Sequence, residues 1–348
     1  MLELDGGYGE GGGQIIRSAC SLAALTGKPV RITAIRANRK QPGLKAQHVT
    51  AVRAAARLCA ADLRGDAVGS SMLLFYPHQP VQHGEYVFDV SVEAQAPSAG
   101  SVVLIAQTLL PALITTPGHS RIVLRGGTDV PFSPPIFYFT QVYLPMLEAL
   151  GAQVRLEIVR HGFYPNGGGE VILDVTGVPA LRLPEWSKAA VVERLHSLIY
   201  LNALPDSMAH RLRERTEELL KPLNLPLTFE TRPAPAPSSG IGLLLTVHTS
   251  LHRAGFTALG RRGWPIEGLA EQTVQECKAY LQSRTFWEKH LADQMVLPLM
   301  LCGARSRTTV AEVTQHLLTN VWVANHFLKT QAHVEGEEGE PGTLIITP

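Results

Sequence analysis

Residues 2–35 read LELDGGYGEGGGQIIRSACSLAALTGKPVRITAI. The pattern predicts a short strand at residues 2–4, a glycine loop at residues 6–13, and a helix from Ile15 to Leu25 with apolar residues at helical spacing. Gly27-Lys28-Pro29 ends this helix, and Val30 to Ile35 is typical of a second strand. A strand, a glycine loop, a helix and a strand in this order indicate a mixed α/β fold.

The glycine loop is the first candidate binding site. Six of its eight residues are glycines, and Glu10 stands among them. Glycines let backbone N–H groups approach an anion closely, and the start of the following helix favours negative charge, so the loop is suited to a phosphate. Glu10 would repel that phosphate unless a divalent cation lies between them. A flexible turn without a ligand is the alternative interpretation.

The spacing Gly7-x-Gly9-x-x-Gly12 also matches the dinucleotide-binding pattern. The opening strand is very short, however, and Arg36 stands where that pattern needs an acidic residue. An oxidoreductase that uses NADP is therefore only a weak alternative.

A basic loop follows the second predicted strand. It holds four cations within ten residues, and two further polar residues follow: Arg36, Arg39, Lys40 and Lys45, then Gln47 and His48. Arginine binds phosphate through paired hydrogen bonds, so this loop is a second candidate phosphate site, close in sequence to the glycine loop. A solvated charged surface is the alternative.

Two of the thirteen histidines stand out by their context. Thr314 is a good N-cap, which places His316 in the first turn of a helix. The helix dipole there disfavours the imidazolium, so we expect the ring to stay neutral and nucleophilic while the helix end attracts a phosphate. His290 begins the segment HLADQ, residues 290–294, whose polar residues lie about one helical turn apart. A histidine that merely starts a helix and a buried polar patch are the respective alternatives.

The rest of the chain alternates strand and helix patterns. Strands are predicted at residues 72–75, 86–92, 122–124, 154–159, 171–175, 241–248, 308–313 and 343–346, and helices at residues 45–60, 100–113, 136–150, 207–221, 266–281, 286–301 and 315–328. The pattern Gln-x-x-Leu-Pro begins at Gln107, Gln141 and Gln294, always in a predicted helix, which indicates a repeated α/β unit.

Prolines interrupt the chain near residue 180, and the run PAPAPSSG follows at residues 233–240. We therefore expect residues 182–279 to form a small inserted α/β domain, and residues 1–181 and 280–348 to form the main body.

The composition bounds the function. The chain has 348 residues, 45% hydrophobic and 18% charged, which is typical of a globular protein with a large and a smaller domain. Its net charge of +1 excludes a protein that coats a long nucleic acid. No apolar run reaches about 18–20 residues, and no signal-peptide pattern begins the chain, so we expect a cytoplasmic protein without a membrane partner. Its four scattered cysteines predict reduced, mostly buried thiols.

Together these segments resemble the RNA 3′-terminal phosphate cyclase family, and the resemblance covers essentially the whole chain. The matching motifs are GEGGGQIIR at residues 9–17, IRANRKQPGL at 35–44 with QH at 47–48, QTLLP at 107–111, GGTD at 126–129, RHGFYPNGGG at 160–169, LADQ at 291–294 and HLLTN at 316–320. Asn38 and Ala46 depart from the residues expected in the family.

The resemblance implies an enzyme that uses ATP to form a 2′,3′-cyclic phosphate at an RNA 3′ end. ATP and a divalent metal, Mg²⁺ or Mn²⁺, are the implied cofactors. The reaction would pass through a covalent histidyl-AMP and an RNA-adenylate, releasing pyrophosphate and AMP. The resemblance implies that His316 is the nucleophile and that Glu10 holds the metal.

The same resemblance implies two further groups of contacts. Contacts with ATP are implied for Gln107, Pro134, His290, Leu291, Ala292, Asp293 and Gln294. Contacts with the RNA end or with phosphates are implied for Arg17, Arg36, Arg39, Gln47 and His48.

The implied fold is an α+β body of repeated βαβαββ-like units, similar to that of enolpyruvyl transferases, with one small inserted α/β domain. Two other functions stay open. A non-catalytic relative acts in ribosome assembly and lacks the nucleophilic histidine, and an enolpyruvyl transferase would need neither Glu10 nor His316. RNA 3′ ends rather than DNA are the expected partner. The oligomeric state stays open, a homodimer being one option.

Overall fold

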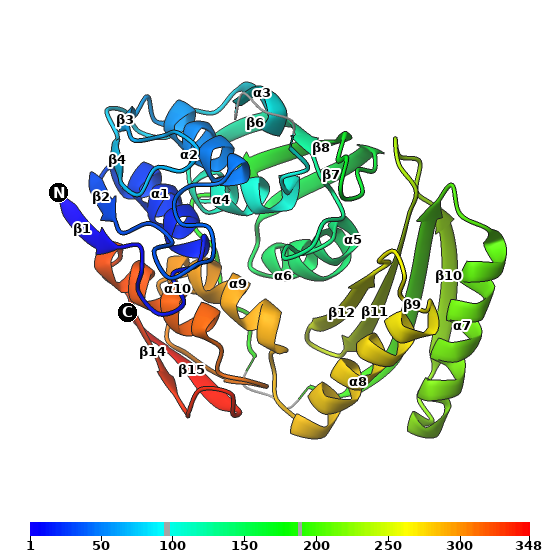
Figure 1. The fold of residues 1–348 in the computed structure, drawn as a ribbon. Coiled ribbons are helices and arrows are strands. Elements are labelled where there is room, and N and C mark those ends of the chain that lie inside the picture. The colour runs from blue at the N-terminus through cyan, green and yellow to red at the C-terminus, as the bar shows by residue number, and fades with distance from the viewer. Residues whose placement is uncertain (94–97, 187–189) are drawn as a thin grey trace.

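The computed structural model describes residues 1–93, 98–186 and 190–348. These residues form four sheets (Figure 1). Three sheets and their helices lie together, and the fourth, with helices α7 and α8, stands to one side. The expected mixed α and β architecture is therefore confirmed. Within the described residues no helix combines the length and apolarity needed to cross a membrane.

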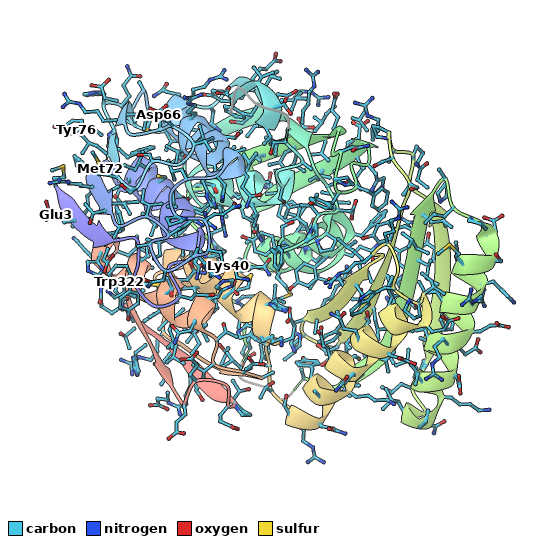
Figure 2. The ribbon with its side chains drawn as sticks, viewed as in Figure 1. Glu3, Lys40, Asp66, Met72, Tyr76 and Trp322 are labelled. Carbon is cyan, nitrogen blue, oxygen red and sulfur yellow. The ribbon has the colours of Figure 1, made fainter. Side chains whose placement is uncertain are left out.

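The first sheet has the strand order β1-β2-β4-β3, with β1 parallel to β2 and the other neighbours antiparallel. Its elements are β1 (Leu2–Asp5), α1 (Gln14–Thr26), β2 (Val30–Thr33), α2 (Ala46–Leu58), β3 (Asp62–Arg64) and β4 (Leu73–Tyr76). Glu3 and Tyr76 lie on the side of this sheet that faces away from the fourth sheet (Figure 2).

The second sheet has the order β5-β6-β8-β7, and again its first pair is parallel and the others antiparallel. Its strands are β5 (Glu85–Asp89), β6 (Gly118–Gly126), β7 (Gln153–Arg160) and β8 (Gly169–Gly177). Its helices are α3 (Val90–Glu93), α4 (Val102–Ile114), α5 (Ile136–Tyr138), the π-helical turn η1 (Phe139–Tyr143) and α6 (Leu144–Ala149).

The third sheet has three strands in the order β13-β15-β14, all antiparallel. Trp287 adds a parallel bridge to Val310 at the outer side of β13. The elements of this unit are α9 (Lys289–Leu301), β13 (Ser306–Val310), α10 (Gln315–Phe327), β14 (Gln331–Glu335) and β15 (Gly342–Thr347).

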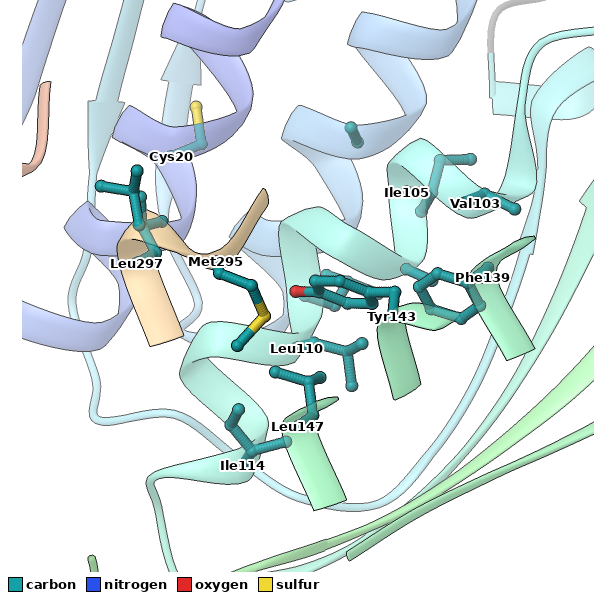
Figure 3. Packing of buried hydrophobic residues seen from close by; sticks show 14 of the residues in the cluster. Cys20, Val103, Ile105, Leu110, Ile114, Phe139, Tyr143, Leu147, Met295 and Leu297 are labelled. Atoms are coloured by element: carbon teal, nitrogen blue, oxygen red, sulfur yellow. The ribbon is translucent and has the colours of Figure 1, made fainter. Parts of the chain in front are cut away.

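The helices of these three units pack together in one core. Tyr143 and Leu147 pack against Leu110 of α4 and Met295 of α9 (Figure 3), and all four side chains are almost fully buried. Truncating such a leucine to alanine typically costs about 2–5 kcal/mol. This core fixes α1, α9 and α10 side by side, and the candidate site lies at their ends.

The fourth sheet, in the order β10-β9-β11-β12, lies within residues 182–279. Its elements are β9 (Val192–Asn202), α7 (Asp206–Leu220), the 3-10 turn η2 (Lys221–Leu223), β10 (Leu227–Pro233), β11 (Gly240–Thr249), β12 (Arg253–Leu259) and α8 (Glu267–Ser283). Leu243 and Leu245 face α7 and α8 in separate small cores, whereas Leu198 and Tyr200 on the opposite face join the main core. Helix α8 runs past residue 279 to Ser283.

Several predicted boundaries were wrong for local reasons. The strand expected at 86–92 ends at Asp89, because the Asp89 carboxylate accepts hydrogen bonds from the N–H groups of Ser91 and Val92 and starts α3. The single helix expected at 136–150 contains a π-helical turn before Pro145. Pro145 has no N–H to donate, and the carbonyl of Gln141 instead accepts a hydrogen bond from Arg253 Nη1.

The predicted starts of the last two helices can be compared with the observed ones. The helix expected from Phe286 begins at Lys289, because the Glu288 carboxylate caps it. The helix expected from Gln315 begins there, as predicted. The cysteines are free thiols, with Cys20, Cys59 and Cys277 buried and Cys302 partly buried, which confirms the prediction.

Candidate active site

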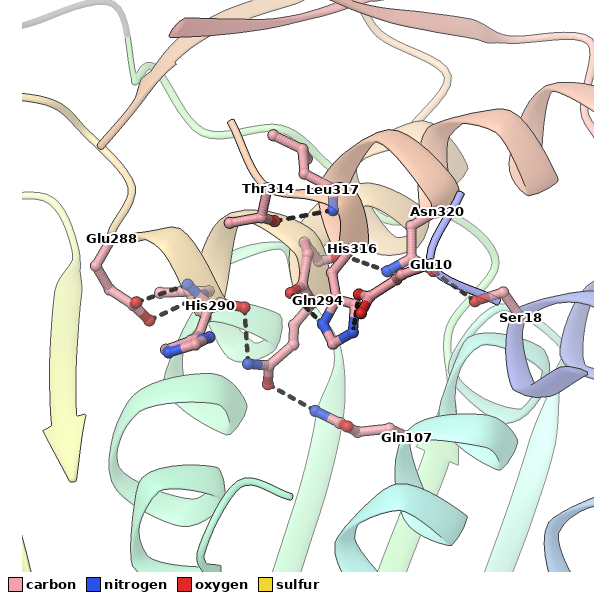
Figure 4. Close-up of polar contacts among 12 residues, drawn as sticks. Glu10, Ser18, Gln107, Glu288, His290, Gln294, Thr314, His316, Leu317 and Asn320 are labelled. Atoms are coloured by element: carbon pink, nitrogen blue, oxygen red, sulfur yellow. Dashed lines mark hydrogen bonds and ion pairs between the residues drawn. The ribbon is translucent and has the colours of Figure 1, made fainter. Parts of the chain in front are cut away.

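His316 lies between two carboxylates that come from distant parts of the chain. Its Nε2 is 2.7 Å from Glu10 Oε1, and its Nδ1 is 3.7 Å from Asp293 Oδ2 (Figure 4). The Thr314 hydroxyl accepts a hydrogen bond from the Leu317 N–H at 3.1 Å, so the expected N-cap is confirmed and His316 stands in the first turn of α10. The cap therefore sets the direction in which the ring leaves the helix.

One side chain ties together the three helices around this histidine. Asn320 of α10 donates to the backbone carbonyl of Asp293 on α9 at 3.1 Å and accepts from the Ser18 hydroxyl of α1 at 2.9 Å (Figure 4). Asn320 is buried, so both bonds are shielded from water. The positions of His316 and Asp293 are thus fixed relative to each other.

The two carboxylates set the direction in which the pKa of His316 is shifted. Asp293, and to a smaller extent Glu10, raise the pKa of His316 above its ordinary value, while partial burial and Arg17 work in the opposite direction. The helix end alone was expected to disfavour the imidazolium, and this expected direction is wrong for the protein without ligands. Carboxylates in contact with the ring outweigh the dipole of one helix end.

The glycine loop places Glu10 at the centre of this arrangement. Glu10 Oε2 also accepts from Arg39 Nη2 at 2.5 Å, so the carboxylate joins His316 to the basic loop. A Cβ atom on Gly13 would lie 2.2 Å from His48 Nε2, which only glycine avoids. The loop is glycine-rich because its backbone runs directly against site residues.

A basic hollow of about 1250 Å³ opens on one side of His316. The glycine loop, the basic loop and residues of several other segments form its wall. Among them are Glu10, Gly12, Gly13, Arg17, Arg36, Arg39, Lys45, Gln47, His48, Phe132, Tyr164 and His316. Charge of this sign and density is suited to phosphate groups.

Arg17 is the least compensated charge in the site. It stands on α1, and its side chain forms no hydrogen bond or ion pair with any of residues 1–93, 98–186 and 190–348. Burial lowers the pKa of Arg17 to about 10, although the Asp293 carboxylate opposes this effect. The guanidinium still carries a proton at neutral pH, so the site presents an unpaired cation to a ligand.

A second hollow, of about 800 Å³, opens on the other side of His316. Gln107 Nε2 donates to Gln294 Oε1 at 2.6 Å, and Gln294 Nε2 donates to the His290 carbonyl at 2.8 Å (Figure 4). Pro134 and the ring of His290 line the same hollow, and His290 is exposed. Amide groups, a proline and an imidazole form a surface suited to a planar, hydrogen-bonding ligand such as a nucleobase.

The buried carboxylate of Glu288 holds one wall of this second hollow in place. Glu288 accepts from the N–H groups of His290 and Leu291 at 2.7 Å each, and from the Tyr138 hydroxyl at 2.5 Å. Burial raises the pKa of Glu288, and burial beside Glu288 raises that of Tyr138 well above its ordinary range. These three partners of Glu288 fix the start of α9 and hence the segment from His290 to Gln294.

His316 and Arg17 are among the residues that line both hollows. Among the described residues, no three His, Cys, Asp or Glu side chains gather into a metal-binding group. The imidazole of His316 thus has the amide-rich hollow on one side and the basic hollow on the other.

Known proteins resemble this chain over most of its length. The sequence model of the family described as "RNA 3′-terminal phosphate cyclase" matches residues 8–334. The chain belongs to this family. A protein named RNA 3′-terminal phosphate cyclase from Methylococcus capsulatus is 43% identical over 349 residues, covering 99% of this chain and 96% of that protein. Proteins of the same name from Nostoc punctiforme and Pyrococcus abyssi are 41% and 37% identical, each over at least 96% of both chains.

Most residues that the cyclase resemblance singled out do line the two hollows. Gln107, Pro134, His290, Asp293 and Gln294 line the amide-rich hollow, and Glu10, Arg17, Arg36, Arg39, Gln47 and His48 line the basic hollow. Leu291 and Ala292 line neither hollow, because their side chains are fully buried in the core.

Three of the basic-hollow residues also have structural partners. Arg36 Nη1 donates to the carbonyls of Gln41 and Gly43 at 2.9 Å and so shapes the basic loop. Gln47 Oε1 accepts from the Ser101 N–H at 3.2 Å. His48 Nδ1 accepts from the Lys45 N–H, and burial holds the pKa of His48 well below its ordinary value. His48 thus offers a neutral ring rather than a charge.

Sequence reasoning missed part of this cyclase site. Phe132 and Tyr164 line both hollows, and Thr257, Arg261 and Arg262 of the fourth-sheet unit line the amide-rich hollow. Glu288 carried little signal, because Ser, Thr, Asp and Asn rather than Glu are the preferred N-cap residues. Tyr164 lies in the motif at residues 160–169, but it was not singled out, and no motif marked Phe132. Thr257, Arg261 and Arg262 carried no signal, since only the packing of the fourth sheet against the body brings them to the site.

Proposed function

We propose that this chain uses ATP to convert the 3′-terminal phosphate of an RNA into a 2′,3′-cyclic phosphate. The observation that carries the proposal is the position of His316 on the shared wall of an amide-rich and a basic hollow. A nucleophile at that position can reach a nucleotide on one side and a terminal phosphate on the other. The names of the relatives support the same reaction.

In the first step His316 attacks the α-phosphorus of ATP. A proton on Nδ1, which faces Asp293, leaves the Nε2 lone pair free for this attack. The new P–N bond forms as the bond to pyrophosphate breaks, giving a histidyl-AMP. The carboxylate of Asp293 orients the ring and stabilises its positive charge, as the carboxylate does in other histidine pairs.

The later steps need little chemistry from the protein. An oxygen of the RNA 3′-phosphate attacks the AMP phosphorus, the P–N bond breaks, and the histidine is released. The neighbouring 2′-hydroxyl then attacks the activated RNA phosphorus and AMP leaves. This last step is intramolecular, so alignment and neutralisation of charge by Arg17 and Arg39 are sufficient.

A divalent cation fits the residues present, with Glu10 as its protein ligand. Mg²⁺ and Mn²⁺ are commonly held by one or two carboxylates together with substrate phosphates, which agrees with a lone loop carboxylate beside a basic hollow. The cation would supply charge neutralisation at the phosphates. Glu10 would then exchange its contact with His316 for the cation, which frees Nε2.

The amide-rich hollow is the proposed adenosine site. Gln107 and Gln294 offer amide donors and acceptors, and Pro134 and His290 offer flat surfaces for the base. Leu291 and Ala292 would contribute only through their backbone and through the position of α9.

The finer description of the fold supports the same assignment. We infer that the first three sheets derive from one βαβαββ unit, as in enolpyruvyl transferases, because the first two sheets share strand order and sense. In the third, Trp287 occupies the place of the missing first strand. Gln107–Pro111 and Gln294–Pro298 lie in α4 and α9, the first long helices of the second and third units. Residues from about 182 to 279 would then be an insertion that ends within α8.

The other functions are less well supported. A non-catalytic ribosome-assembly relative lacks the nucleophilic histidine, whereas His316 is present with two oriented carboxylates. An enolpyruvyl transferase has no use for this histidine. RNA is the proposed partner, and a cytoplasmic location and the oligomeric state remain predictions.

The test is an RNA whose 3′-phosphate carries a radioactive label, incubated with protein, ATP and Mg²⁺ or Mn²⁺. We expect the label to become resistant to phosphatase only when ATP is present, because a cyclic phosphate has no free monoester. A label that stays sensitive to phosphatase under every condition would contradict the proposed function.

A further inference from the structure

Phe132 has an unusual position at the mouth of the site. Its side chain is fully exposed to solvent, and its backbone lies in the left-handed region at φ +63°. A bulky residue other than glycine rarely adopts this conformation, which costs about 1–2 kcal/mol. A strained backbone that holds an apolar ring in water calls for a functional explanation.

The loop that carries Phe132 is fixed at its base. The buried carboxylate of Asp129 accepts from the Thr128 hydroxyl at 2.6 Å, from the Tyr200 hydroxyl at 2.9 Å and contacts His161 Nδ1 at 3.0 Å. Tyr200 stands on β9, so this network joins the loop to the fourth sheet. The position of Phe132 is therefore not that of a free loop end.

The loop itself has little freedom. Pro131 precedes Phe132, and Pro134 and Pro135 follow it two and three residues later, each with a fixed φ. The Ser133 hydroxyl donates to the Val130 carbonyl at 3.3 Å and closes the turn. The ring is thus presented to the solvent on a rigid backbone, so little backbone entropy is lost when it binds a ligand.

Phe132 shares its surroundings with one other exposed aromatic residue. Tyr164 is also exposed, and both residues line the amide-rich hollow and the basic hollow. The basic hollow beside them holds Arg17, Arg36 and Arg39. Aromatic faces next to a positively charged groove are the combination with which proteins hold single-stranded nucleic acid.

We propose that Phe132, assisted by Tyr164, stacks on the 3′-terminal nucleobase of the RNA while its phosphate lies in the basic hollow. The inference rests on the proposed function and names the contact that orients its substrate. The terminal base is one sugar away from its 3′-phosphate, so a phosphate beside His316 places that base at the rim. Stacking accepts every base, which gives an enzyme that recognises an RNA end without reading its sequence.

The adenine of ATP is the less suitable partner for this ring. The amide groups of Gln107 and Gln294 mark the adenosine site, together with Pro134 and His290. Phe132 instead lies where the two hollows meet, on the rim that the basic hollow shares.

The experiment measures KM for a short single-stranded RNA with a 3′-phosphate, and for the same RNA with an abasic terminal nucleotide. For the intact RNA we expect Phe132→Ala to raise KM by about 5-fold to 100-fold, which is the range of base stacking on an aromatic side chain. Phe132→Trp should retain a KM close to that of the natural protein. Phe132→Gly should match Phe132→Ala, because glycine keeps the left-handed backbone.

The abasic RNA makes the test specific. It should bind the natural protein and Phe132→Ala with the same weakened KM, because it has no base to stack. Tyr76→Ala, which removes an exposed aromatic far from both hollows, is the control and should leave both values unchanged.

Two results would overturn the inference while leaving the proposed function intact. One is that Phe132→Ala leaves the KM for intact RNA unchanged, or raises the KM for the abasic RNA by the same factor. The other is a raised KM for ATP in self-adenylation without RNA, which would assign the ring to adenine. Failure of the natural protein to cyclise RNA or to bind AMP covalently would instead contradict the proposed function itself.

Discussion

Glu10 Oε1 lies 2.7 Å from His316 Nε2, although the two residues are 306 positions apart in the chain. The glycine loop before α1 and the capped start of α10 meet at this contact. The contact joins the first and third sheet units. It also places the Glu10 carboxylate, a candidate metal ligand, against Nε2 of His316, the nitrogen that we propose as the nucleophile. Binding of a cation by Glu10 would then also release the nucleophile.

The charge state of His316 gives the first prediction. The neighbouring Asp293 and Glu10 raise the pKa of His316 in the protein without ligands, so the proton leaves at a pH above the ordinary histidine value of about 6.5. Self-adenylation should fall as the pH drops through this raised pKa, because a protonated ring cannot attack phosphorus. NMR titration of the imidazole measures this pKa directly.

Substitution of the two carboxylates tests whether they raise the pKa of His316. Asp293→Asn should lower the pKa of His316 more than Glu10→Gln does, because Asp293 makes the larger contribution. The acid limb of self-adenylation by Asp293→Asn should move to lower pH by the same amount. A pKa for His316 at or below 6.5 in the natural protein would contradict this account of the site.

Removal of the loop carboxylate gives the second prediction. Glu10→Ala should raise the metal concentration that half-activates self-adenylation by about tenfold or more, in the range seen when groups that support a metal are removed. Glu3→Ala is the matched control, since Glu3 is an exposed carboxylate on β1 that lines neither hollow (Figure 2). If both variants need the same metal concentration for half-activation, Glu10 does not bind the metal.

Arg17 gives a prediction in which stability and activity move in opposite directions. An uncompensated and partly buried guanidinium destabilises the fold, so Arg17→Met should raise the free energy of unfolding by about 1–3 kcal/mol. The same change should lower the rate of RNA cyclisation, because a phosphate loses its cation. Urea denaturation and the cyclisation assay measure the two effects, and a destabilised variant would show that Arg17 has a structural partner.

Gly13 tests whether the glycine loop is rigid against the site. Gly13→Ala places a Cβ 2.2 Å from His48 Nε2 and 3.1 Å from Arg17 Nη1, so we expect loss of RNA cyclisation through displacement of these side chains. Gly268→Ala in α8 is the control, because its Cβ would have no neighbour closer than 3.8 Å. That change should stabilise the protein by about 0.5–1 kcal/mol. Normal cyclisation by Gly13→Ala would show that the loop can move to accept a Cβ atom and is not rigid.

The sequence predicted the features that depend on local chemistry. The Thr314 cap, the position of His316 in the first helical turn and the glycine loop around Glu10 all follow from neighbouring residues, and the structure confirms each placement. The repeated Gln-x-x-Leu-Pro pattern lies in helices, as expected.

The features that were missed depend on contacts between distant segments. Strands β9, β10 and β12 were not predicted, because their pairing partners decide them more than their own patterns do. The pKa direction of His316 was wrong for the same reason, since Asp293 and Glu10 reach the ring only in the folded chain. The exposure of Phe132 likewise follows from a turn whose base is held by Asp129 and Tyr200.

The most direct test of the account is self-labelling with ATP that carries a radioactive α-phosphate. The protein is incubated with Mg²⁺ or Mn²⁺ but no RNA, and the label that remains after denaturing electrophoresis is measured for the natural protein and for His316→Ala. We expect an acid-labile, base-stable label on the natural protein, as for a phosphoramidate, and none on a His316→Ala variant that keeps its circular dichroism spectrum. An equal label on both proteins, or no label on either, would contradict His316 as the nucleophile.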